Sequence, residues 1–212
     1  MLETGLGLDV AGGSGFEPFG QNMSFKRYYG SGRYHLPAPK TAAQIIRPTL
    51  QVRWKSKEPS TFAGNTPTGH ILNAPNEQVV TAVYFPFVDP AIVGKTCRLA
   101  FRLSQDDWIV GPQNQPVVFD VYRLASCLND KYSWGNRIPR TTHIGVLTPT
   151  KGQQAAWEGV DMSGDTTLPV MGSAPEFPCA LGEYSFELVA RPGTNIGWNS
   201  ARGSGLTIEI DS

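Results

Sequence analysis

The chain has 212 residues, enough for one large domain or two small ones. Its 18 Lys and Arg balance its 18 Asp and Glu, so it lacks the basic footprint of a nucleic-acid-binding protein. It also lacks the Lys/Arg runs that bind anionic membrane surfaces and the stretch of about 18 apolar residues that spans a membrane. Composition and charge therefore exclude nucleic acid and membrane as expected partners.

Residues 1–43 differ in composition from the rest of the chain. The stretch "GLGLDVAGGSGFEPFG" is Gly-rich, and residues 1–15 lack both the basic start and the apolar centre of a signal peptide. Either the protein is not secreted, or a signal has been removed from this chain. We predict an extended arm over residues 1–43 and one domain over residues 44–212.

From residue 45 onward, apolar and polar residues alternate in short segments, as strands with one buried face require. Gly and Pro together make up about a fifth of the chain, well above the usual share of roughly 12%, and they separate these segments as turns. The pattern predicts an all-β fold: an antiparallel, jelly-roll-like β-sandwich of about eight strands. The alternating segments, in chain order, are "RPTLQVRWK", "VVTAVYFPF", "CRLAFRL", "PVVFDVYRL", "HIGVL", "EYSFELVA" and "GLTIEI".

The charged residues of these segments fall on the alternate positions, which predicts a solvated outer sheet face. If the N-terminal arm folded over that face, the same residues would instead become the walls of a pocket. The residues concerned are Arg53, Arg98, Arg102, Asp120 and Glu187.

Three cysteines are present, Cys97, Cys127 and Cys179. Cys97 and Cys179 each precede a strongly alternating segment, so a disulfide between them would tie two strand beginnings across the sandwich. Closing a loop of about 80 residues would stabilise the fold by about 4 kcal/mol. The alternative is three buried thiols in a reduced protein. A glycosylation sequon at Asn22 agrees with a disulfide and a secretory route.

The stretch "AVYFPFVDPAIVGKTCRLAFRL" resembles the C-terminal domain family named after the fungal ubiquitin-three-binding protein But-two. The match consists of Phe85, Phe87, Asp89-Pro90 and 94–97, read as Gly-Lys-Thr-Cys, with "FPCALGEYSFEL" and "GLTIEI" fitting the later family segments. Cys127 and the Trp-bearing turns depart from the family pattern. The resemblance covers roughly residues 43–212 and implies a fungal β-sandwich, commonly secreted or surface-associated.

The chain is also similar, more loosely, to fungal β-sandwich proteins of natural-product biosynthesis. That likeness implies a cofactor-free pericyclase, which would join a reactive quinone methide to a terpene by hetero-Diels–Alder cycloaddition. A role as partner in a ubiquitin-like pathway is implied only by the But-two family name, so we give it the least weight.

Motifs for several other chemistries are missing from the sequence. His35, His70 and His143 show no metal-binding spacing, no Cys-x-x-Cys pair is present, and no Gly-x-Ser-x-Gly elbow occurs. We therefore expect no metal and no cofactor. The adjacent Asp106 and Asp107 are read as a solvated turn, with a glycosidase acid/base pair as the alternative.

Aromatic and cationic residues provide the candidate site. In "FKRYYGSGRYHLP", Arg33, Tyr34 and His35 are candidates for polarising a substrate carbonyl, although a structural role for His35 is the commoner one. Tyr28 and the tryptophans of the turns and strand ends are candidates for contacting a ring-shaped ligand, with packing onto the sandwich ends as the alternative. These tryptophans are Trp54, Trp108, Trp134 and Trp198.

Two functions follow from these candidates. The first is a cofactor-free enzyme that orients an apolar, carbonyl-bearing small molecule, with a pericyclase as its concrete form. The second is a secreted cell-wall or surface protein, without enzymatic activity, that binds a glycan or another protein by stacking its tryptophans on the ligand.

Overall fold

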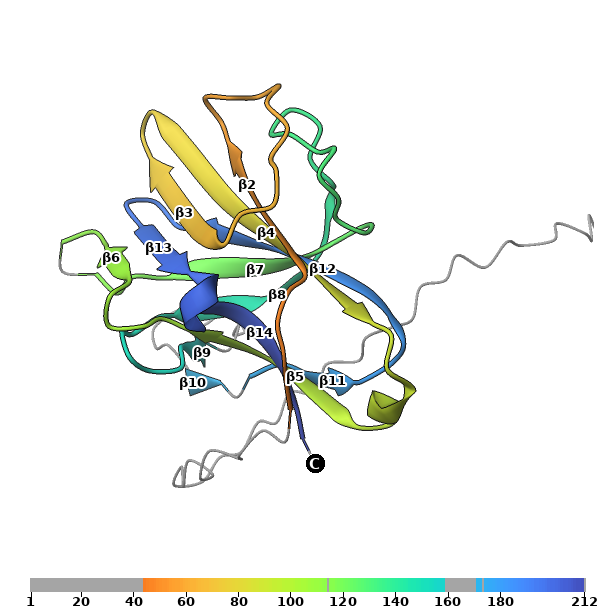
Figure 1. The fold of residues 1–212 in the computed structure, drawn as a ribbon. Helices are drawn as coiled ribbons and strands as arrows, with labels where there is room; N and C mark the ends of the chain where they lie inside the picture. The colour runs from red at the N-terminus through yellow and green to blue at the C-terminus, as the bar shows by residue number, and fades with distance from the viewer. Residues whose placement is uncertain (1–43, 114, 159–170, 173, 212) are drawn as a thin grey trace, which may run out of the picture.

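The computed structural model describes residues 44–113, 115–158, 171–172 and 174–211, so the expected arm at 1–43 lies outside the described residues. The described chain forms two antiparallel sheets, which confirms the all-β sandwich (Figure 1). Two short 3-10 helices, η1 (Pro90–Ile92) and η2 (Ser200–Arg202), interrupt the strands. The small sheet has the strand order β1 (Gln44–Ile46), β14 (Gly205–Ile210), β5 (Thr96–Arg102) and β11 (Glu176–Pro178).

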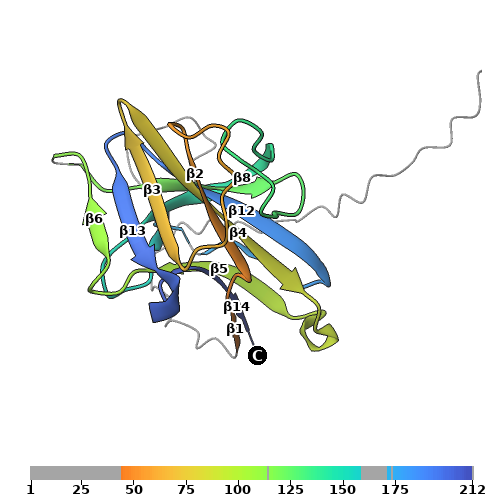
Figure 2. The same cartoon turned by 45° about the horizontal axis from the view of Figure 1, so that its top comes forward.

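The large sheet has ten strands and curls strongly, so that β6, β13 and β3 lie together at one side of the molecule (Figures 1 and 2). One strand, β2 (Leu50–Lys55), lies off the main path and pairs with β4. Along the main path the order is β10 (Met171–Gly172), β9 (Ala156–Glu158), β8 (Arg140–Thr148), β7 (Phe119–Leu124), β12 (Gly182–Ala190), β4 (Glu77–Phe87), β3 (Thr68–Ala74), β13 (Asn195–Asn199) and β6 (Trp108–Val110).

The main core lies between the two sheets. Alternate residues of β12, such as Phe186 and Leu188, are fully buried there with Leu99 and Phe101 of β5. This follows from the period-two geometry of a strand, which sends every second side chain to the same face. The seven segments expected from the alternation correspond to β2, β4, β5, β7, β8, β12 and β14.

A second apolar cluster lies on the opposite face of the large sheet. On β4, Val83 and Phe85 belong to the main core, whereas Ala82 belongs to the second cluster. The cluster is covered by two loops that bond to each other, since Gly135 N donates to Pro59 O at 2.8 Å. Much of the outer face of this sheet is therefore buried, and the expectation of a solvated face is wrong for Glu187, which is 1% exposed.

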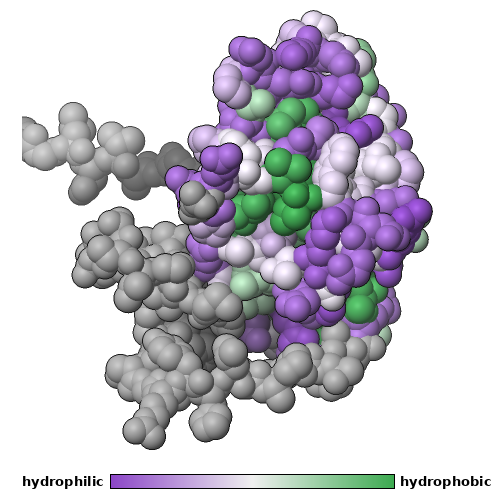
Figure 3. Space-filling view, turned by 90° about the vertical axis from the view of Figure 1, so that its left-hand side faces the viewer, coloured by the Kyte–Doolittle hydropathy of each residue, from purple (hydrophilic) through white to green (hydrophobic). Residues whose placement is uncertain are grey.

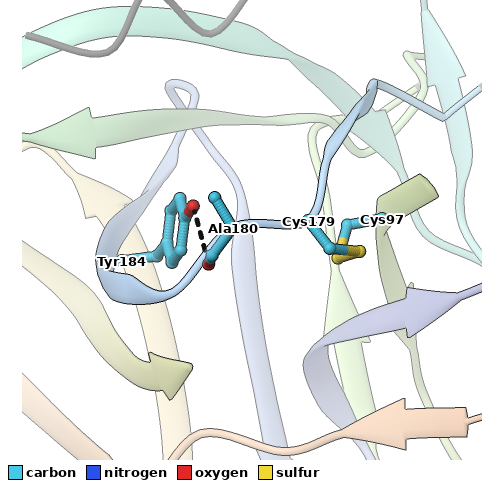
Figure 4. Close-up of a disulfide and its surroundings, with 4 residues drawn as sticks. All are labelled: Cys97, Cys179, Ala180 and Tyr184. Atoms are coloured by element: carbon cyan, nitrogen blue, oxygen red, sulfur yellow. Dashed lines mark hydrogen bonds between the residues drawn. A yellow bond between two sulfur atoms is a disulfide. The ribbon is translucent and has the colours of Figure 1, made fainter. Parts of the chain in front are cut away.

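The disulfide between Cys97 and Cys179 is formed, with a Cα–Cα distance of 5.2 Å (Figure 4). It does not cross the sandwich as expected, because Cys179 directly follows β11, which pairs with β5 in the same small sheet. From Cys179 the chain crosses to β12, where the Tyr184 hydroxyl donates to Ala180 O at 3.3 Å. The disulfide and this hydrogen bond together fix the segment that connects β11 of the small sheet to β12 of the large sheet.

Trp198 fills the core beside a glycine on the neighbouring strand. Gly69 of β3 pairs in register with Trp198 of β13, and a Cβ at Gly69 would overlap the indole ring. The indole also packs edge-on against Phe101, with 5.3 Å between the ring centroids. The glycine is required here because the tryptophan occupies the space of its missing side chain.

Replacing Gly69 by alanine is expected to lower the free energy of unfolding by about 1–3 kcal/mol, because the added methyl group overpacks the core. Urea denaturation measures the change. Gly64→Ala is the matched control, since nothing lies within 4 Å of a Cβ at Gly64. Equal unfolding midpoints for the two variants would contradict this account of the packing.

Candidate functional site

Trp108 forms an exposed aromatic surface at the edge of the large sheet. It is the first residue of β6, the last strand on that side, and is 50% exposed. Its register partner on β13 is Gly197, where a Cβ would overlap the indole. Because the glycine has no side chain, the indole packs directly on the β13 backbone while half of its surface stays open to solvent.

His70 extends this surface onto β3. It pairs in register with Gly197, and its ring meets the Trp108 ring edge-on, with 5.4 Å between the centroids. The His70 Nε2 lies 2.9 Å from Asn195 Oδ1, an acceptor, so this nitrogen carries the proton. Burial lowers the pKa of His70; the hydrogen bond to Asn195 offsets part of this effect, and the nearby charge of Arg53 adds to it. The ring is therefore neutral at pH 7, which leaves Nδ1 as a hydrogen-bond acceptor.

A shallow hollow of about 150 Å³ lies beside β2, on which Arg53 and Lys55 are placed. Lys55 is paired with Glu58 at 2.8 Å, whereas within the described chain no carboxylate pairs with Arg53. Phe62, which is 64% exposed, contributes an open aromatic ring to the same hollow. We name the combined surface of Trp108, Gly197, His70, Asn195 and this hollow the edge surface.

Apolar side chains gather in the middle of the side of the molecule that carries β6, with polar side chains around them (Figure 3). On β6, Val110 is 58% exposed next to the half-exposed Trp108. An apolar centre with a polar border is the usual composition of a surface that binds a ligand or a partner.

The other described tryptophans are packing residues. Trp54 is 1% exposed in the second cluster, where its indole nitrogen donates to Tyr132 O at 3.2 Å. Trp134 is half-buried against the same cluster. Trp198 belongs to the main core and lies within β13 rather than in a turn. The structure thus brings Trp54 and Trp134 together and leaves Trp108 on the surface.

The remaining expected site residues lie outside the described residues. They are the catalytic candidates Arg33, Tyr34 and His35, the ligand-binding candidate Tyr28, and the glycosylation candidate Asn22.

The acidic pair is only in part the solvated turn that the sequence suggested, because Asp106 is exposed in a turn whereas Asp107 is buried. Asp107 is only 6% exposed and accepts hydrogen bonds from the backbone nitrogens of Ser104, at 2.7 Å, and Asn199, at 3.1 Å. Asp106 forms an exposed ion pair with Arg202 at 3.0 Å. Asp107 therefore ties the turn before β6 to the end of β13, which supports the position of Trp108.

Cys127 is a free and exposed thiol that donates to the Glu183 carboxylate. The Tyr84 hydroxyl donates to the same carboxylate, and this hydrogen bond is the main reason that the pKa of Tyr84 rises to about 12. Partial burial, together with Glu183, also raises the pKa of the Cys127 thiol. The thiol therefore stays protonated at neutral pH and is a weak nucleophile.

Sequence reasoning missed most of the edge surface. His70, Asn195 and Gly197 lie on β3 and β13, whose segments "TGHILNA" and "NIGWN" contain turn-forming residues and show no regular alternation. A sequence signal for the pairing of β13 with β3 and β6 is the combination of Gly69 and Gly197 with Trp198 and Trp108, since a large ring often covers a strand glycine.

No protein-family model matches the chain, and no curated protein matches it. In the described residues, no group of three or more His, Cys, Asp or Glu side chains is placed to hold a metal ion. Helices of the length and apolarity needed to cross a membrane are also absent from that part of the chain.

Proposed function

We propose that this protein is a secreted, non-enzymatic β-sandwich that binds glycan at the edge surface. The observation that carries the proposal is the Trp108 indole, which is supported from below by the Gly197 backbone and is half exposed. A rigid indole offers a large flat area at a low cost in conformational entropy. The apolar face of a sugar ring fits this area.

The groups around Trp108 suit the hydroxyl edge of a sugar. His70 Nδ1 can accept a hydrogen bond, and the guanidinium of Arg53 can donate several. The nearby hollow is lined by further charged and hydroxyl groups, including Lys55 and Thr61. A lining of this kind favours a hydroxyl-rich ligand over an apolar polyketide or terpene.

The disulfide supports the secretory part of the proposal, because disulfides persist mainly in oxidising compartments. It joins Cys97 and Cys179, which are two of the positions included in the resemblance to the But-two C-terminal family. Membership of that family therefore stays part of the proposal. The pericyclase alternative depends on Arg33, Tyr34 and His35, and its test is whether Arg33→Ala or Tyr34→Phe slows turnover without unfolding the protein.

Replacing Trp108 by alanine is expected to weaken glycan binding about 30-fold, since truncating a central tryptophan typically costs about 2 kcal/mol. Wild type should be retained on insoluble chitin or β-glucan at low salt, and the variant should remain in the supernatant. Leu181→Ala is the matched control because Leu181 is also 50% exposed. Wild type that is retained on neither polymer, or a Trp108→Ala variant retained as well as wild type, would rule out this site.

A further inference from the structure

A buried carboxylate on the outer face of the large sheet holds two arginines. Glu187 lies in the middle of β12 and is 1% exposed. Its Oε2 accepts a hydrogen bond of 2.5 Å from Arg140 Nε, and its Oε1 forms an ion pair of 3.5 Å with Arg137 Nη1. Oε1 is buried and has no hydrogen-bond partner in the described chain. Burying an incompletely bonded carboxylate costs free energy. We therefore infer that Glu187 serves to position the two arginines rather than to pack the sheet.

Each arginine is also held against an aromatic ring. The Arg137 guanidinium lies 3.7 Å from the centroid of Trp134, and that of Arg140 lies 4.7 Å from the centroid of Tyr122. Stacking of a guanidinium on an aromatic face is favourable and limits the orientations of the side chain. Glu187, Trp134 and Tyr122 therefore fix both cations in place before any ligand arrives.

The two arginines border a hollow of about 220 Å³. Asn73 and Gln78 add amide groups to its lining, and Val80 and Val189 add apolar surface. The Nη atoms of Arg140 meet no acceptor among the described residues, so this end of the guanidinium fork remains available for a ligand.

The charges beside the hollow do not cancel. Two arginines face one carboxylate, which leaves a net charge of +1 among these three groups. The next carboxylate along the sheet, Asp120, is already paired with Arg191 at 3.0 Å and with His143 at 2.8 Å. A pre-positioned pair of guanidinium groups with unused donors is the arrangement that binds an oxyanion through two parallel hydrogen bonds.

We propose that this hollow is an anion site, in which Arg137 and Arg140 bind one oxyanionic group of a ligand and Glu187 is the positioning residue. Its chemistry admits a carboxylate, a sulfate or a phosphate ester. The site shares no residue with the edge surface, so it stands independently of glycan binding at Trp108.

Calorimetric titration of the full chain with sodium glucuronate, sodium sulfate and sodium phosphate tests the site, each against sodium chloride of equal ionic strength. We expect saturable binding of at least one anion, weakened about tenfold or more in Arg140→Gln and in Arg137→Gln. Arg47→Gln, at an exposed arginine that lines neither hollow, is the control and should bind as wild type does. The strongest of the three anions identifies the source as an acidic sugar, a sulfated group or a phosphate ester.

A measurement on the wild-type protein covers the case in which the variants do not fold. The side-chain Nε–Hε NMR signal of Arg140 should shift on addition of the anion and saturate with the calorimetric affinity. No saturable heat beyond that of chloride, together with an unmoved Arg140 signal, would overturn the proposal. An equal loss of affinity in Arg47→Gln would overturn it as well, because it would indicate a general effect of net charge rather than a site.

Discussion

Replacing both Cys97 and Cys179 by alanine is expected to lower the free energy of unfolding by about 4 kcal/mol. The disulfide closes a loop with a sequence separation of 82 residues, and the entropy that this loop loses in the unfolded chain accounts for that value in the chain-entropy model. Both cysteines are buried, so the lost sulfur contacts add to the effect. Urea denaturation of the variant, and of wild type with and without reductant, measures it.

Cys127→Ala is the matched control for the disulfide, because it removes a cysteine that is exposed and free. Its unfolding midpoint should equal that of wild type. Thiol titration of the denatured, unreduced protein should count one reactive group. A count of three, or a double variant as stable as wild type, would refute a stabilising disulfide in the purified protein.

Replacing Glu187 by glutamine is expected to destabilise the protein by about 3 kcal/mol. The side chain keeps its shape but loses its charge, so the half-buried guanidinium groups of Arg137 and Arg140 lose the carboxylate that compensates them. Removing one partner of a buried ion pair typically costs 3–5 kcal/mol, and the partial exposure of both arginines places this case at the lower end. Equilibrium denaturation in urea gives the difference directly.

Glu183→Gln is the control on the same strand. Glu183 is exposed and accepts from Tyr84 and Cys127 at the surface, so its replacement should cost less than about 1 kcal/mol. If Glu187→Gln stays within about 0.5 kcal/mol of wild type, Glu187 does not hold the two arginines in the folded protein.

The Glu187→Gln variant also tests the anion site. If Glu187 positions Arg137 and Arg140, then Glu187→Gln should weaken anion binding even where the protein remains folded, although the variant is less negative. A purely electrostatic effect has the opposite sign, because removing a negative charge near a bound anion strengthens its binding. Measuring the anion affinity under conditions in which the variant is fully folded separates the loss of positioning from the electrostatic effect.

The strands that the sequence predicted carry apolar residues that pack into one of the two clusters, and most of them alternate regularly. In β14, for example, Leu206, Ile208 and Ile210 are buried at every second position, and the alternation is visible in the sequence alone. The strands that it missed contain glycine and asparagine, as β13 does with Asn195 and Gly197. These residues favour turns locally, and only the large rings of Trp108 and Trp198 packed on the strand glycines explain their place in the sheet.

The alternation pattern thus determined the all-β class. The cysteine positions left two arrangements open, and the structure decided for the disulfide between Cys97 and Cys179. The tertiary structure decided which tryptophans are buried, that Glu187 lies beneath two arginines, and that Trp108 faces solvent. The physical reason is that alternation reports the period of a strand, which is a local property of the chain. Burial of an outer face depends on loops distant in sequence, such as those joined by Gly135 and Pro59, and no local pattern carries that information.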